Sequence, residues 1–131
     1  AKLFMNAGAT APEWAAGLKH IIATRNMTGK SADVAITGVG FKPSAAILFA
    51  AINNTYVFSL GIIQGKTNSG IRSNYAGTVY GGQTKAVDIV TEGAEGQTAD
   101  WLSWDDDGCT LRWTKIGSPT GTLTINCLFI R

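Results

Sequence analysis

The chain has 131 residues, of which 45% are hydrophobic and only 15% are charged, and its formal net charge is +2. This length is typical of one domain, and so small a net charge gives no reason to expect direct binding of nucleic acid. No apolar run approaches the roughly 18 residues of a membrane-spanning helix, so no membrane partner is expected. The charged fraction lies well below the ~25% of typical domains, which predicts that another subunit covers part of the surface.

The first 17 residues differ from the rest and predict an N-terminal arm. Thr10, Pro12 and Glu13 have the pattern of a helix start, and Gly17 ends that helix after barely one turn. Because a single helical turn is not stable alone, the arm must lie either on its own domain or on a neighbouring subunit. Its apolar side chains are the candidates for contact with a partner protein or with another subunit: Leu3, Phe4, Met5 and Trp14.

From residue 18 onward the sequence is a succession of short strands separated by turns. Apolar and polar residues alternate, and turn residues recur at roughly ten-residue spacing. We therefore expect residues 18–131 to form an all-β domain, an antiparallel β-sandwich or jelly-roll-like fold of eight or nine short strands. The polar stretch 65–70 is expected to be a loop, and no helix is expected beyond the arm.

Two neighbouring strands in the middle of the chain are unusually apolar. The run Ala45 to Ile52 is apolar on both of its faces, which fits a strand with a second layer on one side and a partner on the other. Leu48 and Ile52 are therefore candidate contact residues. The strand that follows has one clear apolar face, made by Tyr56, Phe58, Leu60 and Ile62.

The last thirty residues predict a half-buried β-hairpin that closes the core. Apolar residues alternate in 109–113 and again in 123–129, and a Gly- and Pro-marked turn at 116–121 separates the two runs. The inward positions of these runs are Cys109, Leu111, Trp113, Leu123, Ile125, Cys127 and Phe129. The opposite parity carries Leu128 and Ile130 outward, which is more apolar surface than the last strand of a monomer should show, so both are candidate subunit contacts.

The two cysteines fall on the inward parity of this predicted hairpin. Cys109 and Cys127 could lie nearly opposite each other across the turn, so a cross-strand disulfide is geometrically conceivable. Two reduced thiols in the core are the favoured interpretation, because free cysteine behaves as a small buried apolar residue.

No pattern in the sequence is typical of an enzyme or a metal site. His20 is the only histidine, so a multi-histidine zinc site cannot form and a Ser-His-Asp triad would depend on this one residue. The acidic run 105–107 lacks the ligand ladder of a calcium loop and is interpreted as a solvated turn. We therefore expect no catalytic, metal-binding or cofactor-binding residues.

Aromatic residues offer the one candidate for ligand binding. A group of them could form a platform for sugar, although aromatics in a small sandwich usually belong to the core. The members of that group are Tyr56, Tyr75, Tyr80, Trp101 and Trp104. Tyr75 and Tyr80 stand in Gly-, Ser- and Asn-rich surroundings and are the candidates to face a ligand.

Two short runs resemble a recurring module of tailed-bacteriophage structural proteins. The first is Ala35-Ile-Thr-Gly-Val-Gly-Phe-Lys-Pro43, which precedes an apolar strand. The second is Asp107-Gly-Cys-Thr-Leu-Arg-Trp-Thr114, which precedes a Gly-Ser-Pro-Thr-Gly turn. In that group a Gly-Phe-x-Pro motif precedes a central strand, and an Asp-Gly-Phe-Thr-Leu-x-Trp motif heads the last hairpin. The chain departs from the pattern at Cys109, where an aromatic residue is more usual.

The resemblance covers residues 18–131 and implies a β-sandwich in a virion, often assembled as a trimer, with no catalytic residues. Such modules occur as fibre or spike tips and as decoration (cement) proteins on the capsid. Because only a short arm precedes the sandwich, we expect a non-enzymatic, homotrimeric decoration protein. It would assemble in the host cytoplasm and lie on the capsid surface, where the major capsid protein is its partner. The alternative is a receptor-binding or carbohydrate-binding tip module of a tail fibre or spike.

Overall fold

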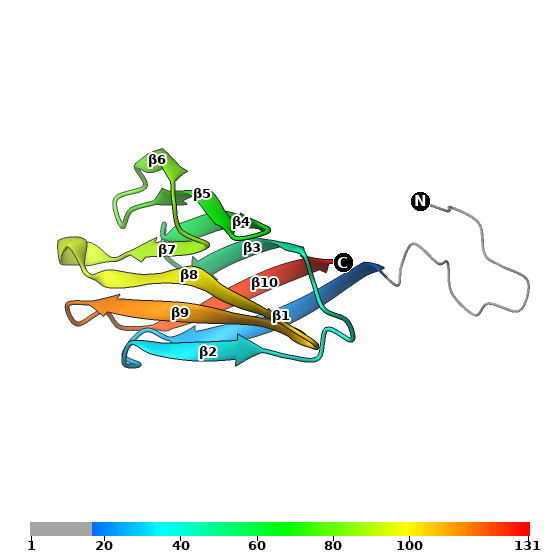
Figure 1. Ribbon diagram of the computed structural model, residues 1–131. Coiled ribbons are helices and arrows are strands. Elements are labelled where there is room, and N and C mark those ends of the chain that lie inside the picture. The colour runs from blue at the N-terminus through cyan, green and yellow to red at the C-terminus, as the bar shows by residue number, and fades with distance from the viewer. Residues whose placement is uncertain (1–16) are drawn as a thin grey trace, which may run out of the picture.

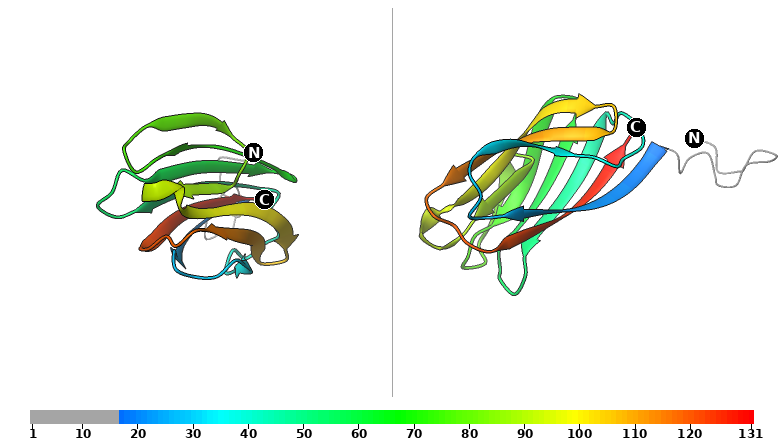
Figure 2. Two further views of the ribbon diagram at one scale, coloured as in Figure 1. Left: turned by 90° about the vertical axis from the view of Figure 1, so that its left-hand side faces the viewer. Right: turned by 90° about the horizontal axis from the view of Figure 1, so that it is seen from below.

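The computed structural model describes residues 17–131, which form two antiparallel β-sheets packed face to face (Figure 1, Figure 2). The strands are β1 (Leu18–Asn26), β2 (Ala32–Ile36), β3 (Ala45–Ile52), β4 (Phe58–Gln64), β5 (Thr67–Ser73), β6 (Val79–Gln83), β7 (Val87–Val90), β8 (Gly96–Asp105), β9 (Gly108–Ile116) and β10 (Thr122–Ile130), with a short helical turn η2 (Glu92–Ala94) before β8. The strand order is β1-β10-β3-β4-β5-β6 in the larger sheet and β2-β9-β8-β7 in the smaller one. The predicted antiparallel β-sandwich is confirmed, with ten strands in the described part of the chain.

The predicted N-terminal arm falls almost entirely outside the described residues. Its helical turn and its four contact candidates, Leu3, Phe4, Met5 and Trp14, belong to positions 1–16. The described chain begins at Gly17, whose carbonyl oxygen accepts the backbone N–H of Arg131 at 2.9 Å. Residues 1–16 are therefore joined to the sandwich beside its C-terminus, where β1 begins and β10 ends (Figure 1).

The core lies between the two sheets, where alternate residues of the strands meet. Its largest fully buried aliphatic and aromatic side chains include Leu48, Ile63, Ile89, Leu111, Leu123, Ile125 and Phe129. Removing one such side chain from water contributes about 1.5–3 kcal/mol, so this layer is the main source of stability.

The predicted closing hairpin is wrong, although the inward alternation within it is right. β9 pairs with β2 and β8 in the smaller sheet, whereas β10 lies between β1 and β3 in the larger sheet. The segment 117–121 therefore crosses from one sheet to the other, and Gly117 and Gly121 take φ values of 68° and 104° in it. A period of two shows which side chains face the core, but it does not distinguish a hairpin from a crossing between sheets.

Cys109 and Cys127 consequently lie on the inner faces of different sheets. Both are fully buried, and both are free thiols. Burial raises the pKa of each thiol to about 12. They are part of the packed core and not a cross-strand pair within one sheet.

The apolar parity of β4 faces outward. Its inward residues are Val57 (just before the strand), Ser59, Gly61 and Ile63, whereas Phe58, Leu60 and Ile62 remain partly or largely exposed. A residue without a Cβ is required at Gly61, because the backbone just before β7 comes close: a Cβ there would collide with the carbonyl oxygen of Ala86. Ile63 is the large side chain of β4 that enters the core.

Two polar side chains fasten loops to the sandwich. The amide of buried Gln97 donates to the carbonyl oxygens of Met27 and Gly29 at 2.9 and 3.0 Å, which holds the turn between β1 and β2. Asp107, in the tight turn between β8 and β9, accepts backbone N–H groups from the loop between β2 and β3. Because all these backbone groups are satisfied, both loops have a fixed position against the sheets.

Candidate functional site: the uncharged face of the larger sheet

The outer side of the six-stranded sheet carries no Asp, Glu, Lys or Arg side chain on its first five strands. The pairing register places the following residues there: Leu18, His20, Ile22, Thr24 and Asn26 of β1; Thr122, Thr124, Asn126, Leu128 and Ile130 of β10; Ala45, Ile47, Phe49 and Ala51 of β3; Phe58, Leu60, Ile62 and Gln64 of β4; and Thr67, Ser69 and Ile71 of β5. We call this surface the uncharged face. Its lack of ionised groups is notable because the whole chain contains 20 of them.

The register brings the large apolar side chains of the uncharged face into contiguous rows. Phe49 of β3 pairs with Leu60 of β4, which in turn pairs with Ile71 of β5. In the adjacent row Ile47 pairs with Ile62. Phe49 is 56% exposed and Ile62 is 45% exposed. Contiguous exposed apolar side chains of this kind mark protein-interaction surfaces.

A hollow of about 670 Å³ lies in the uncharged face. Phe49, Phe58, Leu60 and Ile71 are the large apolar residues of its lining, and its polar residues are the neutral Asn53, Ser59, Thr124 and Asn126. A largely apolar lining without charged residues fits the centre of a protein–protein interface, where charged residues are depleted.

The outer side of the smaller sheet has the opposite character. Arg112 of β9 donates to both carboxylate oxygens of Asp33 of β2, at 2.9 and 3.2 Å, and this hydrogen bonding lowers the pKa of Asp33. Lys85 pairs with Asp100 of β8 at 2.9 Å. Such exposed ion pairs belong to a solvated surface. The sandwich therefore has one water-facing side and one side suited to a partner.

The candidate contact residues from the sequence divide between the core and this face. Leu48 is fully buried, which corrects its assignment as a contact residue, because the outward parity of β3 consists of Ile47 and Phe49. Ile52 shares the inward parity of Leu48 and packs, half-buried, against the core. Leu128 and Ile130 are partly exposed and do lie on the uncharged face.

The aromatic candidates do not form one platform. Trp101 and Trp104 pack against the core with ring centroids 5.9 Å apart. Tyr75 and Tyr80 are 50% and 41% exposed, in line with their polar surroundings. Their surroundings differ: the Arg72 guanidinium stacks over the Tyr80 ring at 4.5 Å, whereas Tyr75 lines a separate hollow together with Tyr56.

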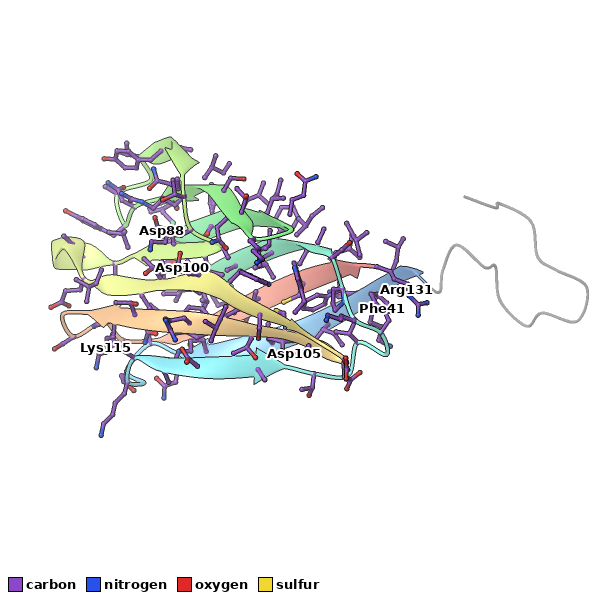
Figure 3. All side chains as sticks on the ribbon, in the orientation of Figure 1. Phe41, Asp88, Asp100, Asp105, Lys115 and Arg131 are labelled. Carbon is purple, nitrogen blue, oxygen red and sulfur yellow. The ribbon has the colours of Figure 1, made fainter. Side chains whose placement is uncertain are left out.

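The acidic run and the histidine have structural partners. Asp105 accepts hydrogen bonds from Ser103 and Thr110 at 2.8 and 2.7 Å, at the end of the sandwich where Figure 3 also places Phe41 and Arg131. His20 lies on the uncharged face, with its Nε2 atom 2.9 Å from Asn126 Oδ1. Among residues 17–131, no group of three or more His, Cys, Asp or Glu side chains is placed to hold a metal ion.

Sequence reasoning missed Phe49, Ile22 and Ile71 as members of one surface. The sequence does contain the relevant pattern: the outward positions of each of these strands carry no charged residue, whereas charged residues cluster in the turns and in residues 85–115. Recognising it requires the strand order, because β1, β10, β3 and β5 come from distant parts of the sequence.

No protein-family model, curated protein or solved structure is significantly similar to this chain. Within the part of the chain that the structure describes, no helix is long and apolar enough to cross a membrane.

Proposed function

We propose that this chain is a non-enzymatic structural protein of a phage virion, a homotrimeric decoration protein that binds and stabilises the head shell. The observation that carries the proposal is the uncharged face. A surface of apolar rows without a single ionised group is suited to permanent burial, as in obligate subunit interfaces, which resemble a core cut in half. The resemblance of the two sequence runs to phage virion proteins supports the choice of assembly.

The uncharged face fits other copies of this chain as its occupant. Five strands about 4.8 Å apart, with about seven residues each at about 3.3 Å, span about 550 Å², which is about two thirds of the roughly 800 Å² per partner of a standard stable interface. Because the face carries no charge, two copies can meet there without repulsion between like charges. A charged partner would find no complementary group on it.

The N-terminal residues are proposed to reach the shell or an adjacent copy. They join the sandwich at Gly17, next to Leu18 and Ile130 at one corner of the uncharged face. A segment that starts at the corner of an interface between copies can extend beyond it to a further partner. Contact with the major capsid protein would then come from residues 1–16.

Two experiments test this function. Immunogold labelling or cryo-electron microscopy of purified particles is expected to place the chain on the head, in the host-assembled virion. Deleting residues 1–16, which leaves the Gly17 carbonyl to accept Arg131 N–H, is expected to preserve the folded oligomer and abolish binding to heads. Labelling confined to the tail, or unchanged head binding by the deletion, would contradict the proposal.

The second candidate function is a receptor-binding or carbohydrate-binding tip module of a tail fibre or spike. The exposure of Tyr75 favours it, because large aromatic side chains in water are common in recognition surfaces. It predicts labelling at the tail tip and binding of the isolated oligomer to host cells.

A further inference from the structure

A second hollow, of about 630 Å³, lies at the end of the sandwich opposite Gly17 and Arg131. Four connections border it: the turn between β3 and β4, the turn between β5 and β6, the η2 segment, and the crossing between β9 and β10 (Figure 1). The pairing of Ala45 with Ile130 and of Ile52 with Leu123 places the β3–β4 turn at this far end. Loops gathered at one end of a β-sandwich are a common place for binding sites.

Two tyrosines dominate the surface of this hollow. Tyr56 is 75% exposed, which makes it the most exposed large apolar side chain in the described chain, and Tyr75 is 50% exposed. A tyrosine offers a flat apolar ring together with a hydroxyl group, and it loses little conformational entropy on binding. Neither ring contributes to the core, so packing does not explain their presence here.

The turn that carries Tyr75 is held rigid by Asn74. The Asn74 Oδ1 atom accepts the backbone N–H groups of Ala76 and Thr78, each at 3.0 Å. The backbone N–H of Asn74 donates to the Thr78 carbonyl oxygen at 2.9 Å, and its own carbonyl accepts the N–H of Gly77 at 3.0 Å. Four hydrogen bonds around one residue fix the direction in which the tip of this turn points.

The turn that carries Tyr56 is fixed in the same way and is tied to its neighbour. Thr55 Oγ1 donates to the Ile52 carbonyl oxygen at 2.7 Å and accepts the Val57 N–H at 3.1 Å. Ser73, which is 2% exposed and adjoins Asn74, donates its hydroxyl to the Tyr56 carbonyl oxygen and accepts the Phe58 N–H at 2.8 Å. The two tyrosine-bearing turns therefore form one preorganised unit.

The polar groups of the hollow define the chemistry of a ligand. Asn54, Thr55 and Thr120 contribute neutral amide and hydroxyl groups, and Glu92 is the only ionisable acid or base besides the tyrosines. Aromatic faces receive the C–H surfaces of pyranose rings, while neutral donors and acceptors suit hydroxyl groups. Without Arg or Lys in the lining, an anionic ligand has no counter-charge there.

We infer that this hollow is a binding site for a neutral saccharide, with Tyr56 and Tyr75 as stacking platforms. Its volume falls within the roughly 300–1,000 Å³ typical of ligand sites. Preorganised turns reduce the conformational entropy that is lost when a ligand binds. The fixed position of both rings is therefore a property expected of a binding site. This inference does not rest on the proposed function, since a head protein and a tail tip could both carry such a site.

The test is titration of the full-length protein, by saturation-transfer NMR and calorimetry, with four neutral probes (maltotriose, lactose, mannotriose and chitotriose), with sialyllactose and with a proline-rich peptide. We expect at least one neutral probe to bind. Tyr56→Ala and Tyr75→Ala should each weaken that binding about tenfold or more. Tyr80→Ala serves as the matched control, because this exposed tyrosine lies outside the hollow, and it should leave the affinity unchanged.

Several results would overturn the inference. These are the absence of binding by every neutral probe, equal binding of sialyllactose, binding of the peptide alone, and binding that survives Tyr56→Ala. Circular dichroism confirms that each variant is folded, which the high exposure of Tyr56 leads us to expect. Since oligomer mass and particle location are measured separately, failure here would not bear on the proposed decoration role, although it would count against a carbohydrate-binding tip.

Discussion

The carboxylate of Asp107 holds the backbone N–H groups of Gly38 and Gly40, at 2.9 and 2.7 Å, across 69 and 67 residues of sequence. The carbonyl oxygen of Asp107 also accepts the N–H of Val39 at 3.1 Å. Gly38 and Gly40 have φ values of 87° and 85°, a region that glycine adopts readily. One residue of the β8–β9 turn thus shapes the loop that leads from β2 to β3.

Asp107→Ala is expected to lower the melting temperature at neutral pH. The hydrogen bonds from Gly40 and Gly38 hold the pKa of Asp107 below its usual value of 3.8, so its contribution to stability is present above that pH and is lost as the pH falls through the lowered pKa. The difference in melting temperature between the wild type and the variant should therefore become smaller at acidic pH. Thermal unfolding at several pH values measures the melting temperatures, and the variant Asp106→Ala, at an exposed position, is the control. An equal loss of melting temperature in both variants would argue against stabilisation by the hydrogen bonds of Asp107.

Cys109 and Cys127 should resist thiol reagents while the chain is folded. Their pKa of about 12, against an ordinary 9.0, lowers the thiolate fraction at neutral pH by about a thousandfold. Stability should in turn decline as the pH rises from 9 toward 12, because the unfolded chain releases these protons first. Titration with Ellman's reagent is expected to count no reactive thiol in the folded protein and two in denaturant. Fast labelling of the native state would show that the core is open there.

Gly61→Ala should destabilise the sandwich strongly. The new methyl group would collide with the Ala86 carbonyl oxygen, and separating β4 from β7 is expected to cost about 3 kcal/mol, or about 10 °C in melting temperature. Gly81→Ala is the control, since a Cβ there would meet only the Ile71 side chain at 3.9 Å. Urea denaturation compares the two variants, and equal stability would mean that the sheets adjust to the added methyl group.

The sequence was informative about which residues face inward and less so about how strands pair. The inward positions of residues 109–113 and 123–129 were predicted correctly, yet β9 and β10 lie in different sheets. Alternation is a local property, whereas pairing is decided by turn geometry and by contacts between distant residues. For the same reason β5 was only partly predicted. Because Thr67–Ser73 is mostly polar, part of it was expected to be a loop, but the strand pairs with β4 along most of its length.

The site was only partly predictable for a related reason. The outward Leu128 and Ile130 were recognised from the excess of apolar residues in the last strand, but Leu48 was assigned to the wrong side of β3. In a strand that is apolar on both parities, composition alone does not distinguish the core side from the partner side. Tyr56 was likewise grouped with the apolar face of β4, although it belongs to the preceding turn and stands in water.

Sedimentation velocity tests directly whether copies of this chain cover the uncharged face. Phe49→Lys places a charge in the middle of that face and should weaken self-association by about 100-fold or more, because a buried unpaired charge is costly. Ile116→Lys changes an apolar residue of similar exposure, 51% against 56%, on the smaller sheet.

We expect the wild-type protein and Ile116→Lys to sediment as trimers at micromolar concentration, and Phe49→Lys to sediment as a folded monomer. A monomeric wild-type protein, or a trimer unaffected by Phe49→Lys, would show that copies of the chain do not cover this face.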